Sequence, residues 1–257
     1  MKIKKETIIL EILDNYPQLE SILVEKYGLH CLGCMGAAFE TLEQGAMAHG
    51  MKKKEMEMMI KDLNKRINDE NKFDQTIKVL KKGGIIIFPT DTVWGVGCLV
   101  NNLKATKKLY QIKKRETSKP TAVLVGTLKQ AQKLAYLNPK SKELIKKHWP
   151  GGLTIILKAK KIVPKIIQGP NKTIGLRMPD HSLILKIIKR LDYGLVAGSA
   201  NLAGKKAPTR KADINLELIK KIDFLLEGKN KGNQASTVVD LTQEPFKVLR
   251  QGWVKIS

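Results

Sequence analysis

The sequence predicts an α/β domain, with a twisted mixed parallel and antiparallel sheet and flanking helices, preceded by a small all-helical domain. From Phe73 onward, short β-branched runs alternate with lysine-rich helical segments, which is typical of an α/β domain. Near the end of the chain several strands follow one another without a helix between them, which favours a mixed sheet over a purely parallel one. The first 70 residues show helical apolar spacing instead. The predicted domains are residues 1–70 and 71–257.

In the first domain, apolar spacing predicts helices over residues 7–13, 19–27, 37–44 and 53–68. Gly28 follows the second helix and is expected to cap its C-terminus. The last helix carries Met56 and Met59 on one apolar stripe, and this stripe reads as core rather than as a ligand site. Asn68 to Lys72 is polar and without periodicity, so the domain boundary is expected there.

In the second domain, strands are expected over residues 85–88, 122–125, 153–157, 173–177, 195–197, 236–240 and 247–250. Helices are expected over residues 74–82, 104–113, 128–136, 140–148, 182–191 and 215–222. Gly95-Val-Gly97 lacks the third glycine of a dinucleotide-binding fingerprint, so it is expected to form a tight turn after a strand. Cys98 lies in an apolar context and is expected to be core.

Composition excludes several protein classes. The 257 residues are 42% apolar, an ordinary proportion for a globular core, and no segment approaches the length of a membrane span. The apolar run near the N-terminus is too short for a signal peptide, and three cysteines do not make a disulfide scaffold. We therefore expect a cytoplasmic protein that does not interact with membranes.

The formal charge of +23 is unevenly distributed. Residues 1–70 carry 10 Lys/Arg and 12 Asp/Glu, whereas residues 71–257 carry 37 and 12, which is a net charge of +25. A domain this basic attracts polyanions. A lysine-rich surface without a specific partner is an equally good interpretation.

The segment from Ser199 to Ala207, together with Pro89 to Thr92 and Lys113 to Arg115, indicates a site for ATP. Small hydroxyl and amide groups at strand ends offer hydrogen bonds without bulk, and the Lys/Arg pair supplies charge for a triphosphate. Hydroxyl residues at strand ends more often cap backbone groups, so each one alone is a weak signal. Arg177 lies between two apolar residues and therefore needs an anionic partner.

Eight motifs follow one another along the chain in the order in which they occur in one known family: Phe88–Gly95, Ile112–Arg115, Lys119–Pro120, Trp149–Thr154, Leu176–Asp180, Ser199–Asn201, Ser236–Asp240 and Leu249–Gly252. Over residues 73–257 the chain resembles the YrdC-like threonylcarbamoyl-AMP synthases. That resemblance implies synthesis of threonylcarbamoyl-AMP and pyrophosphate from L-threonine, bicarbonate and ATP, with Mg²⁺ accompanying ATP. The product serves tRNA threonylcarbamoyladenosine modification, so tRNA or the downstream threonylcarbamoyl transferase complex are implied as partners.

The resemblance also implies roles for individual residues. Lys113 and Arg115 would be catalytic. The ATP-binding residues would be Lys113, Arg115, Lys119, Asn201, Thr209 and Arg250. The threonine-binding residues would be Thr90, Thr92, Arg177, Ser199 and Ser236. Asp91 and Asp240 are candidate Mg²⁺ contacts, although both fit better as structural caps.

The N-terminal domain contains Cys31-Leu-Gly-Cys34. Leu29 to Gly36 and the residues after it resemble the small disulfide-type domain associated with hybrid-cluster proteins. A redox pair of Cys31 and Cys34 is the favoured interpretation, because a helix N-terminus lowers thiol pKa values. Zinc bound with His30 and His49, or inert packing, are the alternatives, and neither histidine has a familiar zinc spacing.

Two other functions are compatible with the sequence. A module of the same fold could bind double-stranded RNA through its basic surface without synthase activity. A carbamoyl transferase with another acceptor is the second alternative. The presence of Lys113, Arg115, Ser199, Asn201 and Arg250 together favours the enzyme, because an RNA-binding surface does not need so selective a set.

Overall fold

The structure, a computed structural model, describes residues 1–30, 32 and 39–256, and the chain divides into two units, Met1–Lys72 and Phe73–Ser257. The described part of the first unit is helical. Its elements are α1 (Ile9–Asn15), the 3-10 helix η1 (Pro17–Leu19), α2 (Glu20–Glu25), α3 (Leu42–Ala48) and the first part of α4 (Lys53–Lys81). Gly28 follows α2 with a φ of 72°, a left-handed conformation that suits glycine after a helix. Met56, Met59 and Leu63 are buried in this unit's core, as the apolar stripe predicts.

α4 differs from the prediction. Residues 68–72, expected to separate two helices, lie inside one continuous helix of 29 residues. Apolar contacts hold the helix on both sides of this polar segment, because Ile67 packs in the core of the first unit and Phe73 in a core of the second. The segment contains neither proline nor glycine, so nothing in it breaks the backbone hydrogen bonds of the helix.

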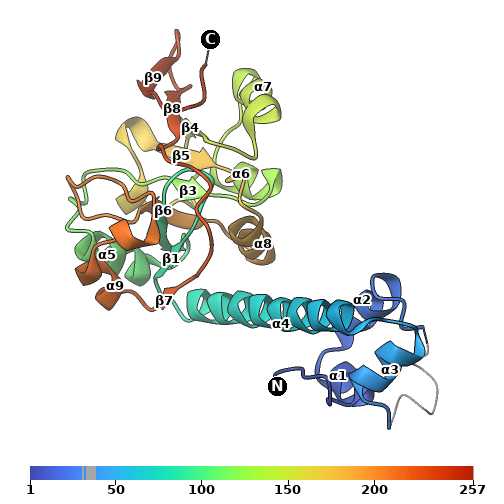
Figure 1. Ribbon diagram of the computed structural model, residues 1–257. Helices are drawn as coiled ribbons and strands as arrows, with labels where there is room; N and C mark the ends of the chain where they lie inside the picture. The colour runs from blue at the N-terminus through green and yellow to red at the C-terminus, as the bar shows by residue number, and fades with distance from the viewer. Residues whose placement is uncertain (31, 33–38, 257) are drawn as a thin grey trace. The chain divides into compact units, whose positions relative to one another are not determined.

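The second unit is built on a nine-stranded sheet in the order β7-β1-β2-β6-β3-β5-β4-β8-β9 (Figure 1). Its strands are β1 (Ile86–Phe88), β2 (Gly95–Leu99), β3 (Val123–Leu124), β4 (Leu153–Lys158), β5 (Thr173–Arg177), β6 (Leu195–Ser199), β7 (Phe224–Leu225), β8 (Thr237–Asp240) and β9 (Lys247–Arg250). Its helices are the end of α4, then α5 (Leu103–Ile112), α6 (Leu128–Leu134), α7 (Pro139–His148), α8 (Ser182–Arg190) and α9 (Leu216–Lys221), with short 3-10 turns η3 (Lys165–Ile167), η4 (Pro170–Lys172) and η5 (Lys211–Asp213).

The sheet is mixed, as predicted. β1 and β7, β3 and β5, and β4 and β8 pair in parallel, while the other neighbouring strands are antiparallel. The expectation of a tight turn at Gly95-Val-Gly97 was wrong, because these residues begin β2, which pairs with β1 and β6. Glycine is required at position 97, where an added Cβ would lie 2.4 Å from the carbonyl oxygen of Val196 on β6.

The two faces of the sheet are covered differently, and this difference creates the site. One face packs against α5, α6, α7 and α9 through the largest apolar core of the unit. The other face packs against α8 and the last turns of α4, through Ile184, Ile187 and Leu80 among others. Those two helices cover only part of that face, and a cavity occupies another part of it.

No helix among the described residues combines the length and the apolar character that crossing a bilayer requires.

Candidate active site

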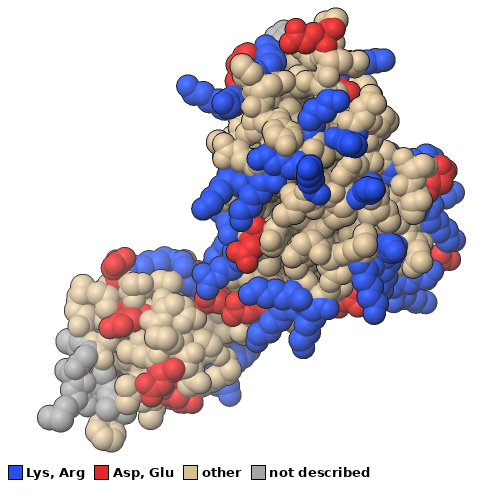
Figure 2. Space-filling model, turned by 180° about the vertical axis from the view of Figure 1, so that it is seen from behind, with Lys and Arg blue, Asp and Glu red and all other residues tan. Residues whose placement is uncertain are grey.

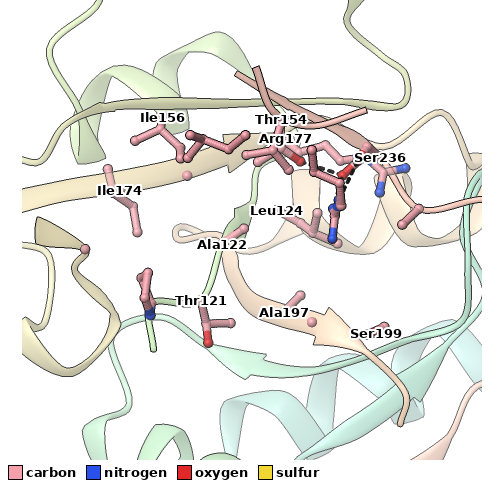
Figure 3. A pocket seen from close by; sticks show the side chains of 18 of the residues that line it. Thr121, Ala122, Leu124, Thr154, Ile156, Ile174, Arg177, Ala197, Ser199 and Ser236 are labelled. Atoms are coloured by element: carbon pink, nitrogen blue, oxygen red, sulfur yellow. Dashed lines mark hydrogen bonds between the residues drawn. The ribbon is translucent and has the colours of Figure 1, made fainter. Parts of the chain in front are cut away.

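A cavity of about 570 Å³ lies along one face of the sheet (Figure 3). Alternate residues of the strands line it, because side chains along a strand point to opposite faces in turn. β4 contributes Thr154, Ile156 and Lys158. Ala122 just before β3, Gly175 on β5 and Ala197 on β6 also line it, and their small size leaves the space open. This sheet surface therefore forms a shallow floor with polar groups around it.

Among the described residues that line the cavity, cations outnumber carboxylates. The lining contains five cationic side chains and one carboxylate, namely Lys113, Arg115, Lys158, Arg177 and Arg250 against Asp240. This imbalance gives the cavity a strong preference for an anionic ligand. A nucleoside triphosphate or a carboxylate has the complementary charge.

The turn after α5 brings Lys113 and Arg115 to the cavity. Lys114 has a φ of 50°, in the left-handed region that usually takes glycine. The amide of Arg115 donates to the carbonyl oxygen of Tyr110 at 2.9 Å, and the amide of Lys114 donates to that of Gln111 at 3.0 Å. These two bonds are those of a Schellman C-cap. The chain therefore reverses within three residues, and Lys113 and Arg115 both line the cavity.

Lys113 is almost completely buried, with 5% of its surface exposed. Its Nζ donates to the carbonyl oxygens of Ser199 and Asn201. Burial, with a contribution from the neighbouring Arg115, lowers the pKa of Lys113 to about 8. Two of the three N–H groups of the ammonium are thus engaged, which leaves one for a ligand.

Arg115 is held by backbone oxygens of the following loop. Its Nη2 donates to the carbonyl of Pro120 at 2.7 Å, and its Nε donates to that of Lys119 at 3.3 Å. The side chain of Lys119 is not part of the cavity lining and instead pairs with Glu116 at 2.9 Å, with both groups exposed.

Arg177 is buried nearly as deeply as Lys113, at 6% exposed, and its guanidinium has three partners. Its Nη2 donates to Oδ1 of Asp91 at 2.5 Å, its Nη1 to Oγ1 of Thr92 at 2.7 Å, and its Nε to the carbonyl oxygen of Gly151 at 3.0 Å. Asp91 is thus the anionic partner that the sequence required. Burial lowers the pKa of Arg177 from its ordinary value, and the adjacent Asp91 carboxylate opposes that effect. Two N–H groups of the guanidinium stay available.

Thr90 and Thr92 belong to the same buried network. Oγ1 of Thr90 lies 3.0 Å from Oγ1 of Thr92, accepts from the amide of Thr92 and donates to the carbonyl of Val93 at 2.7 Å. Both threonines line the cavity. Their hydroxyls therefore hold the Thr90–Thr92 loop in place and also lie at the edge of the cavity.

Arg250 and Ser236 meet at the other side of the site. Nε of Arg250 donates to the carbonyl oxygen of Ser236 at 2.9 Å, and its Nη2 to Oγ of Ser236 at 3.0 Å. Oγ of Ser236 also lies 2.9 Å from Oγ1 of Thr154. Burial lowers the pKa of Arg250 from its ordinary value.

A β-bulge sets the direction of Arg250. The register between β8 and β9 shifts at Val238 and Val239, whose partners are Arg250 and Val248. Leu249 is the extra residue, and both Leu249 and Arg250 line the cavity. Consecutive residues of a regular strand would face opposite sides, so the bulge brings both to the same side.

Not all of the residues predicted for the site meet at the cavity. Lys113, Arg115, Thr90, Thr92, Arg177, Ser199, Ser236 and Arg250 line it, whereas Lys119, Asn201 and Thr209 do not. Asn201 uses its side-chain amide to bond the carbonyl oxygens of Leu202 and Lys205, and its Oδ1 is buried without a partner. Its contact with the site is made through its own carbonyl, which receives Nζ of Lys113 at 2.9 Å.

The structure offers no protein cage for a cation among the residues it describes. No group of three or more His, Cys, Asp or Glu side chains in that part of the chain could hold a metal ion. Asp91 is engaged by Arg177, and Oδ1 of Asp240 caps the amide and hydroxyl of Thr242. Asp240 is thus the structural cap that the sequence favoured, whereas Asp91 pairs with Arg177 instead of capping a backbone group.

The predicted redox pair, Cys31 and Cys34, lies outside the described residues. The two histidines of the zinc alternative are described, and the ring centroids of His30 and His49 lie 6.5 Å apart. Cys98 is a buried free thiol, and burial raises its pKa to about 12. It is core, as expected.

The sequence did not identify Thr154 and Lys158, which line the cavity, or Asn230, which bonds the backbone of Thr90 and Thr92 beside it. The alternation in Leu153 to Lys158 could have found the first two, because Thr154 and Lys158 share the cavity face of β4. Asn230 gives no such signal: its side chain bonds backbone groups about 140 residues away along the chain.

Comparisons with known proteins agree with this fold. A family model named for Sua5, YciO and YrdC and described as "Telomere recombination" matches residues 78–252. A model of a domain of unknown function, DUF1858, matches residues 3–56. The likeness to hybrid-cluster-associated domains therefore stays a prediction.

Relatives and solved structures match the second unit. A relative from Methanocaldococcus jannaschii is 36% identical over 198 residues, covering 74% of this chain and 92% of the relative. The threonylcarbamoyl-AMP synthases of Pyrococcus abyssi and Bacillus subtilis are 32% and 34% identical, and the match covers 53% of each. The chain thus matches about half the length of those two relatives.

Among solved structures, P. abyssi Sua5 complexed with L-threonine matches with a TM-score of 0.66 at 32% identity, over 70% of this chain and 54% of that one. E. coli YciO matches with the same TM-score at 25% identity, over 71% of this chain and 90% of that one. Both structures therefore share the fold of the second unit.

Proposed function

The chain belongs to the Sua5/YciO/YrdC family, and on that premise we propose that its second unit is an L-threonylcarbamoyladenylate synthase. It would make threonylcarbamoyl-AMP and pyrophosphate from L-threonine, bicarbonate and ATP. One observation supports this most strongly: among the described residues, five cations from four segments line a cavity whose lining contains a single carboxylate. A triphosphate together with an amino-acid carboxylate supplies the missing negative charge.

The reaction needs positioning more than covalent help from the protein. The amine of threonine combines with bicarbonate to give a carbamate and water. A carbamate oxygen then attacks the α-phosphorus of ATP, the bond to the β-phosphate oxygen breaks, and pyrophosphate leaves. Holding the two reactants in line and neutralising phosphate charge are the contributions that fixed cations can make.

We assign the residues by their chemistry and location. Lys113 and Arg115, on one turn, would bind the triphosphate, with Arg250 contributing from β9. Arg177, with its two free N–H groups, would bind the carboxylate of threonine, and the hydroxyls of Thr90, Thr92, Ser199 and Ser236 would surround the amino acid. Asn201 would contribute by orienting Lys113 through its carbonyl. Lys119 and Thr209, which are outside the cavity lining, would reach ATP only after their segments move.

Mg²⁺ would enter with ATP as part of the substrate. Oδ1 of Asp91 is engaged by Arg177 and Oδ1 of Asp240 by Thr242, so phosphate oxygens and water would supply most of the ligands, as Mg²⁺ commonly prefers. The ion would neutralise charge on the triphosphate.

The experiment is pyrophosphate release by the purified protein with ATP and Mg²⁺, with L-threonine and bicarbonate each present or omitted. We expect release only when both are present. Release that ignores either substrate, or no release in any mixture, contradicts the proposal.

RNA binding is a second candidate, and one observation favours it. The second unit carries most of the positive charge of the chain, and Figure 2 shows lysine and arginine side chains over much of its visible face. Such a surface binds phosphate backbones with a strong salt dependence. Several expectations stay predictions: double-stranded RNA binding, contact with tRNA or with the downstream transferase complex, and the cytoplasmic location. The alternative activity of a carbamoyl transferase with another acceptor also stays a prediction.

A further inference from the structure

The segment between β7 and β8, residues 226–236, which we call the strap, lies against the loop that carries the partners of Arg177. The amide of Lys231 donates to the carbonyl oxygen of Thr90 at 2.9 Å. Asn230 accepts from the amide of Thr90 at 3.0 Å, and its Nδ2 donates to the carbonyls of Thr92 at 2.9 Å and Gly232 at 2.6 Å. One side chain thus ties both ends of the Thr90–Thr92 loop to the strap.

The strap approaches this loop too closely for side chains. An added Cβ on Gly232 would lie 2.2 Å from the carbonyl oxygen of Asp91 and 2.6 Å from Cα of Thr92. An added Cβ on Gly228 would lie 2.8 Å from Cγ of Pro89. The strap backbone therefore packs on the backbone of Asp91 and Thr92 at Gly232 and on the ring of Pro89 at Gly228, and Asn230 lies between these two glycines in the sequence.

The loop held in this way is the one that orients Arg177. Asp91 and Thr92 accept from its two terminal nitrogens, and both are buried, at 8% and 1% exposed. If the loop shifted, the guanidinium would lose its fixed geometry, because only the carbonyl of Gly151 would still hold it. A cation that must meet a carboxylate with two parallel hydrogen bonds needs that geometry.

We propose that Asn230 is a positioning residue for the amino-acid half of the site, acting on Arg177 through the Thr90–Thr92 loop. This inference rests on the proposed synthase function. An amide is required, because one atom must accept and another must donate twice. Aspartate keeps the acceptor but has no donor, and its charge would face the carbonyl oxygens of Thr92 and Gly232. Alanine has neither group.

The first test compares Asn230→Ala and Asn230→Asp with Asn233→Ala, which removes an exposed asparagine from the same strap. L-threonine and Mg·ATP affinities are measured separately by calorimetry. We expect the dissociation constant for L-threonine to rise about tenfold or more in both Asn230 variants, while that for ATP changes less than about twofold. Asn233→Ala should match the wild type in both affinities.

A second readout needs no substrate. Phenylglyoxal modifies accessible arginines, and mass spectrometry of the peptide containing Arg177 measures its labelling. Arg177 should stay protected in the wild type and in Asn233→Ala, and its labelling should rise in both Asn230 variants. Asn230→Asp keeps the comparison usable if Asn230→Ala does not fold.

The outcomes distinguish the role of Asn230 from the proposed synthase function. Unchanged Arg177 labelling in the Asn230 variants overturns the inference, as does an equal loss of ATP and L-threonine affinity. A wild-type protein that does not bind L-threonine overturns the proposed function and the substrate assigned to Arg177, while the labelling still decides whether Asn230 fixes Arg177.

Discussion

Replacing Asp91 with alanine should destabilise the second unit strongly. Asp91 and Arg177 form an ion pair at 2.5 Å, and their side chains are 6% and 8% exposed. The change leaves a buried guanidinium with only neutral partners, Thr92 and Gly151. Breaking such a pair from one side costs about 3–5 kcal/mol, because the remaining charge is neither hydrated nor compensated.

Urea unfolding followed by tryptophan fluorescence can measure this cost. All three tryptophans, Trp94, Trp149 and Trp253, lie in the second unit, so the signal reports its unfolding alone. The double variant Asp91→Ala with Arg177→Met removes both charges. It should be less destabilised than Asp91→Ala, because no uncompensated charge is left. A loss below about 1 kcal/mol for Asp91→Ala, or a double variant that shows the summed loss of both single variants, would refute the reasoning.

Four further predictions follow from three positions, Lys113, Gly175 and Lys114. Burial lowers the pKa of Lys113 to about 8, so its ammonium loses its charge as the pH rises through that value. ATP affinity, measured by calorimetry, should therefore fall above pH 8 in the wild type. A Lys113→Met variant that shows the same fall would contradict this assignment. The same shift predicts that the free energy of unfolding rises between pH 8 and pH 10.5, where the unfolded chain binds more protons than the folded one. Gly175→Leu should lower ATP affinity at least about tenfold with an unchanged circular dichroism spectrum. The new Cβ would lie 3.3 Å from Cγ2 of Thr154, and the rest of the side chain would enter the cavity. Normal ATP affinity in this variant would show that ATP binds elsewhere. Lys114→Gly should raise the free energy of unfolding by about 0.5 kcal/mol, because glycine adopts a φ of 50° without strain. The ion pair that is lost, Lys114 with Glu217 at 4.0 Å, is exposed and contributes little stability. A loss of stability in urea unfolding would argue against a strained turn.

The strands and helices of the second unit were largely predictable, because β-branched runs and helical spacing report burial directly. β2 was missed since Gly95 and Gly97 weaken the strand signal. Glycine is present there because a neighbouring strand leaves no room for a Cβ at Gly97, and the sequence alone does not show that contact. The helix across residues 68–72 was missed because its polar residues belong to no core.

The site was predictable only in part, for a related reason. The motifs contain Lys113, Arg115, Arg177 and Arg250, and these cations indicate an anionic ligand from the sequence alone. Which groups face the cavity depends on turns and register. The left-handed Lys114 places Lys113 and Arg115 together, and the bulge at Leu249 directs Arg250.

Isolation of the product tests the proposed activity most directly. The purified protein is incubated with ATP, Mg²⁺, L-threonine and ¹³C-bicarbonate, and threonylcarbamoyl-AMP is sought by mass spectrometry beside a Lys113→Ala control. We expect one ¹³C atom in the carbamoyl group of the wild-type product and no product from the variant. Absence of labelled product from wild-type protein that retains its fold and binds ATP would contradict the synthase assignment.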